Sequence, residues 1–339
     1  MFWKPFDKQK IKKVLLISLT NIGDVILTFP VLDILKETFP LAELSVIIGP
    51  KAASLLKDNP HLKQVHIFDK RNTSFQTALW IWKLREEHFD LVIDLRNSAI
   101  PFMIAPRYRT SARVIKKESE HMKDKHIRRL RSVYPFPEKS AQQYAFAISL
   151  LDQEKVTQIK QKEIGAGKFV VLAPGAADQS KRWTEEGFAQ VADHIATAYR
   201  VPVVLVGDKH DQAIAQRILK LTRQPAINLC GRLSLPQLGG LFPGCHLAIV
   251  NDSAPMHLAS YLNIPILAIF GPTDPQKYGP WSTRSRFLRN NTQCLKCQDT
   301  KLNTPHTCIT AITPRHLLES FEIKDNQIIF RQDQQEQKI

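Results

Sequence analysis

The sequence VLLISLTNIGDVILTFPVLDIL spans residues 14–35 and contains a strand pattern followed directly by a helix pattern. Residues 14–17 are continuously apolar, as expected of a strand that is buried on both faces of a parallel sheet. After a loop over residues 18–22, apolar residues recur at helical spacing at Val25, Ile26, Phe29, Leu32 and Leu35. A buried strand followed at once by an amphipathic helix is the repeating unit of α/β folds.

The same alternation continues along the chain in two series. In the first series we predict further strands at residues 44–48, 64–68 and 91–94, and helices at residues 73–87, 121–131 and 140–151. In the second series we predict strands at residues 169–172, 202–206, 226–229, 246–250 and 264–270, and helices at residues 184–199, 208–221, 234–242 and 253–262. Two such series predict an α/β protein with two Rossmann-like domains, each built on a parallel sheet.

A polar stretch around Gly165-Ala166-Gly167 lacks a clear period and is interpreted as the linker between the two series. The predicted divisions are an N-terminal domain over 1–155, a linker over 156–167, a C-terminal domain over 168–325 and a polar tail over 326–339. Ligands of parallel α/β sheets bind at the carboxyl ends of the strands. We therefore expect the active site in a cleft between the two domains.

The composition is that of a globular protein, with 43% hydrophobic and 23% charged residues in 339. The longest apolar runs contain six or seven residues, whereas a membrane-spanning helix needs about 20. The basic N-terminus lacks the long apolar core and the cleavage site of a signal peptide. Five cysteines are an odd number for a secreted disulfide framework. We therefore expect a cytoplasmic protein.

The formal net charge of +15 is concentrated in two segments. Residues 96–131 hold 11 lysines and arginines against 3 acidic residues, and residues 1–13 hold 5 lysines against 1 aspartate. The remainder of the chain is close to neutral. A local basic patch indicates an anionic partner, which could be nucleic acid, a membrane surface or a phosphorylated substrate.

Three loops at predicted strand ends carry residues suited to chemistry. The first is Leu19-Thr20-Asn21-Ile22-Gly23-Asp24, in which Asp24 is either a helix N-cap or a carboxylate base facing the cleft. The second spans residues 172–184 and contains Gly175, Lys181 and Arg182. Two cations before a helix favour an anion site, although a solvated loop with two surface charges has the same pattern.

The third loop is Val250-Asn251-Asp252-Ser253-Ala254-Pro255-Met256-His257-Leu258-Ala259. Its small residues would allow a phosphate to approach the start of a helix. Alternatively, Asp252 and Ser253 are simple caps and His257 is a satisfied core histidine. Gly271-Pro272-Thr273 follows the next strand and is expected on the same rim.

The order of these motifs resembles glycosyltransferase family 9, the bacterial heptosyltransferases of lipopolysaccharide core assembly. The matching pieces lie between about residues 13 and 275 and are Gly23-Asp24-Val25 with Pro30, Pro174-Gly175-Ala176 with Lys181-Arg182-Trp183, Asn251-Asp252-Ser253 with His257-Leu258-Ala259, and Phe270-Gly271-Pro272-Thr273. The resemblance implies a GT-B fold, with two Rossmann-like domains facing across a cleft, the acceptor in the first and a nucleotide-sugar donor in the second.

The resemblance also implies an inverting enzyme that needs no metal or other cofactor and moves heptose from ADP-heptose to a phosphorylated glycolipid of the inner core. The sequence agrees, because it contains no Asp-x-Asp pair to hold a cation on a diphosphate. By this analogy Asp24 is the catalytic base. The residues expected at the donor diphosphate are Lys181, Arg182, Ser253, Ala254 and His257. Gly175 and Asp252 are expected to contact the donor or organise its loop, and Asp208 or Asp211 its ribose.

The chain departs from many relatives near its C-terminus, where it holds three cysteines instead of four. Cys294, Cys297 and Cys308, together with His306, could bind a structural Zn²⁺ ion. A disulfide or redox pair and plain thiols remain the alternatives. Cys230 and Cys245 are interpreted as small core residues.

The basic segment lies in the domain expected to bind the acceptor. Its candidate acceptor-binding residues are Arg107, Arg109, Arg113, Lys116 and Lys117, with a solvated face as the alternative. Aromatic residues beside lysines at 1–6 suit an anionic bilayer surface, although an inert tail is equally compatible. We therefore expect peripheral, salt-sensitive binding to the cytoplasmic face of the inner membrane.

Four other functions would account for some of these sequence features. A nucleotide-dependent oxidoreductase lacks a dinucleotide fingerprint, because Gly165-Ala166-Gly167 precedes a strand. A GT-B enzyme using another nucleotide sugar, or a sugar-nucleotide epimerase, would share the donor loops. A nucleic-acid-binding protein would use the basic patch and leave those loops unexplained. We therefore predict a glycosyltransferase without a nucleic-acid partner.

Overall fold

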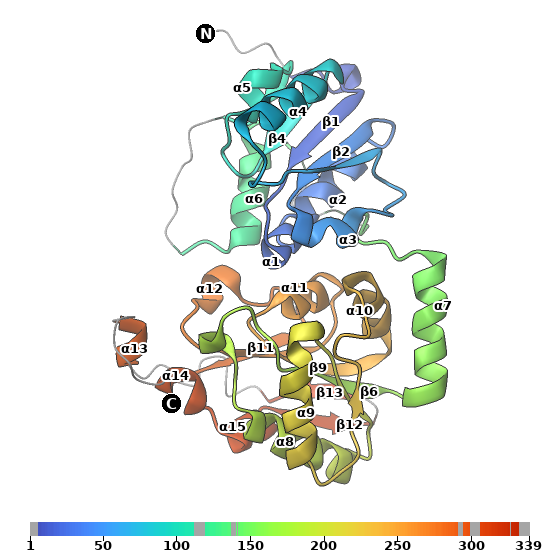
Figure 1. Cartoon of the computed structure of the whole chain (residues 1–339), viewed down its shortest axis with the longest axis vertical. Coiled ribbons are helices and arrows are strands. Elements are labelled where there is room, and N and C mark those ends of the chain that lie inside the picture. Colours follow the sequence, from blue (N-terminus) through green and yellow to red (C-terminus); the bar gives the residue numbers. More distant parts are fainter. Residues whose placement is uncertain are drawn as a thin grey trace. The chain divides into compact units, whose positions relative to one another are not determined.

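The computed structural model describes residues 6–111, 119–136, 140, 142–290, 294–298, 306–325 and 327–331. The chain forms two compact units, Met1–Ser149 and Leu150–Ile339 (Figure 1). Both units are α/β, and each contains one parallel sheet, as predicted. Among the described residues, no helix is both long and apolar enough to cross a membrane.

The sheet of the first unit has five parallel strands in the order β3-β2-β1-β4-β5. They are β1 (Lys13–Ile17), β2 (Glu43–Ile48), β3 (Gln64–Ile67), β4 (Leu91–Asp94) and the short β5 (Tyr108–Arg109). The chain adds strands to one side of β1 and then returns to its other side, where Ile17 pairs with Asp94. This reversal leaves a crevice position at the carboxyl ends of β1 and β4.

Helices cover both faces of this sheet. On one face, Leu15 and Ile17 pack against α4 (Ser74–Glu86) and α5 (Ile100–Ile104), which contact each other. The segment between β1 and β2 forms α1 (Ile22–Ile26) and α2 (Phe29–Thr38), and the segment between β2 and β3 forms η2 (Pro50–Ala52) and α3 (Ala53–Leu56). Helix α6 (Met122–Arg131) packs against α2, and η1 (Lys8–Lys10) precedes β1.

The segment after β1 forms two helices where we predicted one. Helix α1 ends at Ile26 and α2 begins at Phe29. The Thr28 hydroxyl donates to the carbonyl of Val25 at 2.7 Å, and Pro30 lies in the first turn of α2. Because proline has no N–H, it suits a helix start and prevents one continuous ladder of hydrogen bonds.

The helix predicted at residues 140–151 is wrong over most of its length, since the described residues before Leu150 are not helical. The carboxylate of Asp33 accepts the backbone N–H groups of Tyr144 and Ala145 at 2.7 and 2.8 Å. The amide of Asn59 donates to both carbonyls of the same two residues at 2.9 Å. These buried side chains satisfy the backbone that a helix would otherwise satisfy, so local periodicity did not determine the structure.

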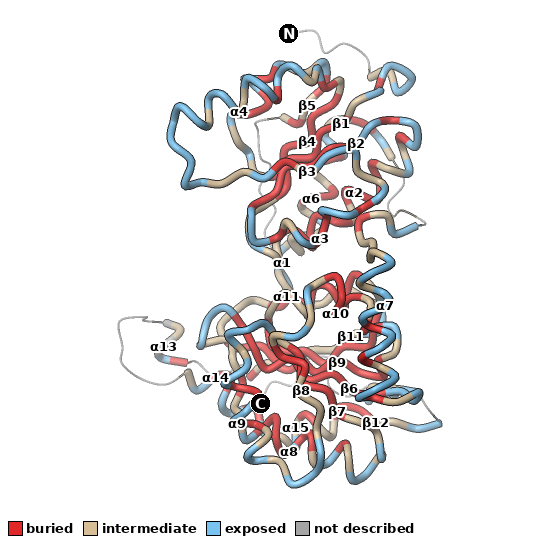
Figure 2. The backbone as a smooth tube through the Cα atoms, turned by 45° about the vertical axis from the view of Figure 1, so that its right-hand side comes forward, coloured by how far each residue is buried: buried red, intermediate tan, exposed pale blue. Residues whose placement is uncertain are grey.

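The sheet of the second unit has six parallel strands in the order β11-β10-β9-β6-β7-β8. They are β6 (Phe169–Ala173), β7 (Val203–Leu205), β8 (Ile227–Asn228), β9 (Cys245–Asn251), β10 (Ile266–Phe270) and β11 (Ser285–Arg289). Numbered from β6, the order across the sheet is 3-2-1-4-5-6, that of nucleotide-binding Rossmann domains. Its reversal lies between β6 and β9, whose residues are buried throughout (Figure 2).

The helices of this unit alternate with the strands. They are α8 (Glu185–His194), which continues as the π-helix η5 (Ile195–Tyr199), α9 (Gln212–Leu221), α10 (Leu235–Leu241) and α11 (Ala254–Tyr261). Shorter elements are η4 (Gln179–Lys181), η6 (Lys209–Asp211), η7 (Phe242–Gly244), α12 (Pro275–Tyr278), α13 (Leu295–Gln298), α14 (Thr307–Thr310) and α15 (Pro314–Glu319).

Two segments that extend across the predicted domain boundaries form helices and strands of the second unit. Helix α7 (Leu150–Ile159) and the π-helix η3 (Lys160–Ile164) occupy most of the expected linker, and the amide of Gln237 in α10 donates to Asp152 at 2.6 Å. Strands β12 (Phe321–Lys324) and β13 (Gln327–Phe330) form an antiparallel hairpin, so the expected tail contributes a strand. The rest of that tail, residues 332–339, lies outside the described residues.

Candidate functional site

The reversal of strand order in the second unit brings two of the predicted loops together. Strands β6 and β9 are neighbours, with Ala173 opposite Val250 at their carboxyl ends. The loop after β6 carries Lys181 and Arg182, and the loop after β9 carries Asp252 and Ser253. The side chains that we selected from separate motifs therefore lie at one edge of one sheet.

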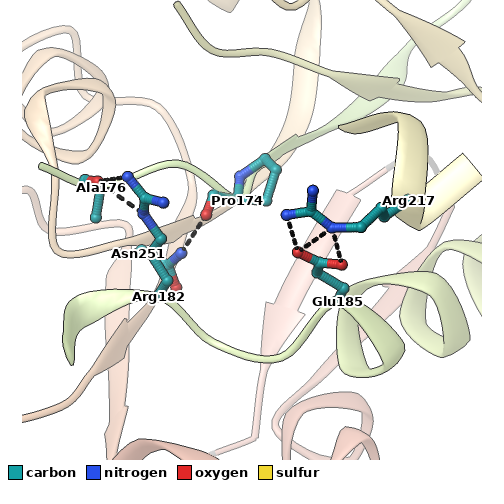
Figure 3. A network of polar contacts seen from close by, with 6 residues as sticks. All are labelled: Pro174, Ala176, Arg182, Glu185, Arg217 and Asn251. Carbon is teal, nitrogen blue, oxygen red and sulfur yellow. Dashed lines mark hydrogen bonds and ion pairs between the residues drawn. The ribbon is translucent and has the colours of Figure 1, made fainter. Parts of the chain in front are cut away.

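Asn251 joins the two loops. This fully buried residue donates its side-chain amide to the carbonyl of Pro174 at 2.8 Å (Figure 3) and accepts the backbone N–H of Trp183 at 3.2 Å. The indole N–H of Trp183 donates to the carbonyl of Ile312 at 2.7 Å. Buried amide hydrogen bonds of this kind fix the loop over residues 174–183 on the end of β9.

Lys181 and Asp252 form the central ion pair of this edge. Their Nζ and Oδ2 atoms are 2.8 Å apart, and the side chains are 32% and 5% exposed. A pair this close to the protein interior is screened less than a surface pair. One ammonium donor is directed to Asp252, which leaves two of the three for another anion. The pair supports the loop-organising role expected for Asp252.

Arg182 holds the same loop from within. Its Nε and Nη2 groups donate to the carbonyl of Ala176 at 2.9 and 2.7 Å (Figure 3). Behind the loop, Arg217 of α9 and Glu185 of α8 form a two-pronged ion pair at 2.7 Å. Two of the N–H groups of Arg182 therefore bind the backbone of the loop. Its positive charge lies next to that of Lys181 along the chain.

Helix α11 starts beside this ion pair. Ser253 is its N-cap, but the hydroxyl donates to the carbonyl of Asn251 at 3.1 Å and makes no cap hydrogen bond. Ala254 begins the helix there. His257 is only 5% exposed and stacks on Trp281, with ring centroids 5.9 Å apart. The buried position agrees with the alternative of a core histidine, and N–H groups at the start of a helix are common anion donors.

Two glycines mark close approaches at this edge. A Cβ on Gly175 would lie 2.2 Å from the carboxyl carbon of Asp211, and a Cβ on Gly271 would lie 2.7 Å from the carbonyl oxygen of Ser180. Both distances are shorter than real Cβ contacts. Gly271 follows β10, so a third strand end packs against the Lys181 loop.

The two ribose candidates differ in their surroundings. Asp208 is exposed, and its carboxylate accepts the N–H of His210 at 2.7 Å. Asp211 is partly buried and accepts the N–H of Asp208 at 3.0 Å. Burial raises the pKa of Asp211 above its usual value. The two residues form a reciprocal capping box around η6, and Asp211 is the one that touches Gly175.

Asp24 in the first unit lies in the first turn of α1, and the N-cap is Asn21. The amide of Asn21 donates to Oδ2 of Asp24 at 3.0 Å. Asp24 is partly exposed, and its loop follows β1 at the reversal of that sheet. The residue is therefore an oriented carboxylate at a strand end and not the cap of its helix.

The sequence reasoning missed Asp94, which ends the neighbouring strand β4. This buried carboxylate accepts the N–H groups of Arg96 and Ser98 at 2.9 and 2.6 Å. Arg129 donates to the carbonyl of Asp94 and, at 3.0 Å, to the side chain of Asn97. Burial lowers the pKa of both arginines below the usual value. The position of Asp94 at the end of an apolar run was the available signal.

Of the predicted acceptor-binding residues, the structure describes two. The guanidinium of Arg107 lies 5.5 Å from the ring centre of Tyr108, and that of Arg109 lies 4.1 Å from the ring centre of Phe102. Both are cation–π distances. Arg113, Lys116 and Lys117 lie outside the described residues.

An exposed apolar surface on α4 and α5 was also missed. It consists of Phe75, Leu79 and Trp82 on α4 with Phe102 and Met103 on α5, which are 44–78% exposed. Phe75, Leu79 and Trp82 follow one another at spacings of four and three residues, so they share one helix face. Lys83 and Arg85 are exposed on the same helix. We call this set the α4–α5 surface.

The C-terminal Cys/His residues come together. The ligand atoms of Cys294, Cys297, His306 and Cys308 all lie within 4.8 Å of one another, and none of the chain's five cysteines is in a disulfide. Cys230 and Cys245 are buried in the core, as predicted, and burial raises the pKa of each thiol to about 12.

Several known proteins with a similar sequence are named heptosyltransferases. Lipopolysaccharide heptosyltransferase 3 of Escherichia coli is 27% identical over 77% of this chain and 84% of its own length. Lipooligosaccharide heptosyltransferase 2 of Campylobacter jejuni is 27% identical over 90% of this chain and 96% of its own.

Two solved structures share the fold along most of both chains. The family 9 glycosyltransferase of Veillonella parvula aligns with a TM-score of 0.77 and 22% identity, covering 91% of this chain and 95% of that one. ADP-heptose lipopolysaccharide heptosyltransferase II of E. coli gives 0.73 and 23%, covering 91% and 96%. The two sheets described above thus form a GT-B fold. The model of glycosyltransferase family 9 (heptosyltransferase) matches residues 79–307. With the motifs assembled at the strand ends and this match over most of its length, the chain belongs to glycosyltransferase family 9 and is a glycosyltransferase of the heptosyltransferase type.

Proposed function

We propose that this glycosyltransferase transfers heptose from ADP-heptose to a phosphorylated acceptor in the inner core of lipopolysaccharide, with inversion at the anomeric carbon. The observation that carries the proposal is the Lys181–Asp252 ion pair at the reversal between β6 and β9, in a chain of this family. The donor would bind to the second unit and the acceptor to the first. Relatives that are named heptosyltransferases support the choice of sugar.

The edge between β6 and β9 has the properties that a nucleoside diphosphate requires. Lys181 keeps donors for phosphate oxygens, and Arg182 adds a second positive charge. The first turn of α11, from Ser253 and Ala254, directs N–H groups and the positive end of its dipole toward the same edge. His257 would act from the following turn by supporting the start of the helix. These charges would stabilise the leaving diphosphate without a bound divalent cation.

The nucleoside would lie along Gly175 toward β7. Asp211 is favoured over Asp208 for the ribose hydroxyls because its partly buried carboxylate lies against Gly175. Gly175 leaves room for the Asp211 carboxylate, because a Cβ there would collide with it.

Asp24 is proposed as the base of a single displacement. Its carboxylate would take the proton of the acceptor hydroxyl while that oxygen attacks the anomeric carbon, and the bond from this carbon to the diphosphate oxygen would break. The hydrogen bond from Asn21 supports the role, since it orients one carboxylate oxygen. ADP would leave with the electron pair of the broken bond.

We also propose that the enzyme acts at the cytoplasmic face of the inner membrane through the α4–α5 surface. Five exposed apolar side chains beside Lys83, Arg85 and Arg109 match the arrangement of a helix lying at an anionic bilayer. The basic residues Arg107 and Arg109, in the same unit, would meet the phosphates of a glycolipid acceptor.

A panel of nucleotide sugars tests the proposed function. The purified protein is incubated with ADP-heptose, UDP-sugars or dTDP-sugars, with and without core glycolipid, in a buffer free of added divalent cations. We expect rapid nucleoside-diphosphate release only with ADP-heptose and glycolipid together, at a rate that added Mg²⁺ leaves unchanged. Conversion of a donor in the absence of acceptor would favour an epimerase, and release from another sugar would replace heptose as the substrate.

A further inference from the structure

The Cys/His cluster near the C-terminus is not used by the reaction proposed above. It consists of Cys294, Cys297, His306 and Cys308, whose ligand atoms all lie within 4.8 Å of one another. The Sγ atom of Cys297 is 3.4 Å from Nδ1 of His306 and 3.6 Å from Sγ of Cys308. These distances are well above an S–S bond of about 2.05 Å, so the residues are neighbours without being joined.

The spacing of these atoms fits one tetrahedral metal ion. Bonds of about 2.3 Å from zinc to sulfur and about 2.0–2.1 Å to nitrogen give ligand–ligand distances of roughly 3.5–3.8 Å. The distances from Sγ of Cys297, 3.4 Å to the His306 nitrogen and 3.6 Å to the Cys308 sulfur, are close to those values. The widest separation, 4.8 Å, exceeds it by an amount that side-chain rotation can close.

The four residues lie in two pairs along the chain, one pair at α13 and the other at α14. Cys294 and Cys297 flank the start of α13, where the N–H of Cys297 donates to the carbonyl of Cys294 at 2.9 Å in a tight turn. His306 is the N-cap of α14, and Cys308 lies in its first turn. Cys294 and Cys308 are each 4% exposed, while Cys297 and His306 are partly exposed, so the cluster is half buried.

We propose that Cys294, Cys297, His306 and Cys308 bind one Zn²⁺ ion in a closed, four-coordinate structural site. Three thiolates and one imidazole form a soft donor set that suits zinc and does not suit Mg²⁺ or Ca²⁺. All four positions are supplied by the protein, so the ion has no open position for a substrate. Its role is to hold α13 and α14 together.

The helix α14 that carries Cys308 is close to the loop that carries Lys181. Ile309 of α14 is buried in the core, and a Cβ on Gly271 would touch both Ile309, at 3.4 Å, and the carbonyl of Ser180. The segment that follows α14 accepts the indole N–H of Trp183 at Ile312. The bound ion thereby fixes the inner wall of the loop over residues 178–183, and its loss would loosen that loop.

Metal content tests the proposal without reference to transferase activity. The full chain, purified without chelators, is analysed for zinc and iron by mass spectrometry, and the zinc that denaturation releases is titrated with a chromogenic chelator. We expect about one zinc per chain. The variants Cys297→Ser and Cys308→Ser should lose it, whereas Cys230→Ala, which removes a buried thiol outside the cluster, should keep it.

A second variant separates metal loss from misfolding. His306→Cys retains four soft ligands and should keep its zinc and wild-type circular dichroism, while Cys297→Ser should show a lower thermal midpoint. A wild-type chain with no stoichiometric metal, or with Cys297 and Cys308 recovered as a disulfide, would overturn the site. Iron in place of zinc would overturn the assignment of the ion, and equal zinc in wild type and Cys297→Ser would identify adventitious metal.

Discussion

Asp24 carries the proposed proton transfer, and its neighbours determine how it can act. The carboxylate is oriented by Asn21 and remains partly exposed in the first turn of α1. Removing a general base costs typically 10²–10⁴-fold in rate. We predict that Asp24→Asn lowers kcat by roughly that factor and leaves the dissociation constant for ADP within about twofold. The substitution preserves shape and removes the charge, so only the chemical step should change.

Steady-state kinetics and ADP titration calorimetry check this prediction. Asp58→Asn, at an exposed carboxylate in the same unit, is the matched control and should behave as wild type. An Asp24→Asn enzyme with a kcat near the wild-type value would remove Asp24 from the role of base.

Gly271 tests the packing beneath the donor loop. An added Cβ would lie 2.7 Å from the carbonyl oxygen of Ser180, so the loop that carries Lys181 would have to move. We predict that Gly271→Ala weakens ADP binding by roughly tenfold, equivalent to about 1.4 kcal/mol. Gly167→Ala is the control, because no atom lies within 4 Å of its Cβ position.

The same calorimetric titration measures both glycine variants. If Gly271→Ala bound ADP as tightly as Gly167→Ala does, the diphosphate would not depend on the position of this loop. The assignment of Lys181 to the donor would then lose its structural support.

Lys181 itself is tested by removing its charge. We predict that Lys181→Ala weakens ADP binding by roughly tenfold to a hundredfold, because a charge-assisted hydrogen bond contributes about 1.5–3 kcal/mol. Lys277→Ala, which removes a lysine from the exposed pair with Asp274, should bind ADP normally. Titration of both variants in parallel checks the prediction, and equal affinities would refute it.

Helix α4 is the element on which membrane binding is proposed to depend. Its buried side holds Leu84, while Phe75, Leu79 and Trp82 face solvent. We predict that Phe75→Ser/Leu79→Ser/Trp82→Ser reduces binding to phosphatidylglycerol vesicles at least tenfold, because the exposed apolar area would be lost. Binding of the wild type should also fall as salt is raised.

Vesicle flotation at low and high salt measures this effect. The control is Leu150→Ser/Leu151→Ser, which removes two side chains of α7 that are 79% and 76% exposed. Vesicle binding that neither salt nor the α4 substitutions changed would exclude the α4–α5 surface as the membrane contact.

The elements that were predicted correctly are those whose sequence pattern reflects burial. The continuously apolar runs of β1, β6 and β9 became central strands, because a strand covered on both faces has no polar positions. The segment at residues 142–149 failed because two distant side chains, Asp33 and Asn59, satisfy its backbone. No local period contains that information.

In the candidate site, too, features of the local sequence were predicted and contacts between distant residues were not. Asp24, Lys181 and Asp252 were found because each follows a predicted strand, and strand ends gather at one edge of a parallel sheet. The ion pair between Lys181 and Asp252 and the clamp by Asn251 depend on side-chain geometry across 60–80 residues of sequence, as in the hydrogen bond from Trp183 to Asn251. The α4–α5 surface was missed because the sequence of a helix does not show whether its apolar residues pack on the sheet or face solvent.

At the scale of the whole molecule, the two Rossmann-like units divide the proposed work. The first holds Asp24, the basic residues and the α4–α5 surface, and the second holds the donor loops. The formal net charge of +15 has its concentrated part in the first unit, where an anionic glycolipid would bind. In this proposal each sheet provides the binding site for one of the two substrates.

We propose that this chain adds heptose to a core glycolipid, and mass spectrometry of the acceptor detects the transfer itself. Heptose-deficient core glycolipid is incubated with ADP-heptose and the enzyme, and its mass is compared with that from a reaction containing Asp24→Asn. We expect a mass increase of one heptosyl unit with the wild-type enzyme and, over the same incubation time, only a trace of it with the variant, whose kcat should be roughly 10²–10⁴-fold lower. An unmodified acceptor after complete consumption of ADP-heptose, or transfer by both proteins at the same rate, would contradict it.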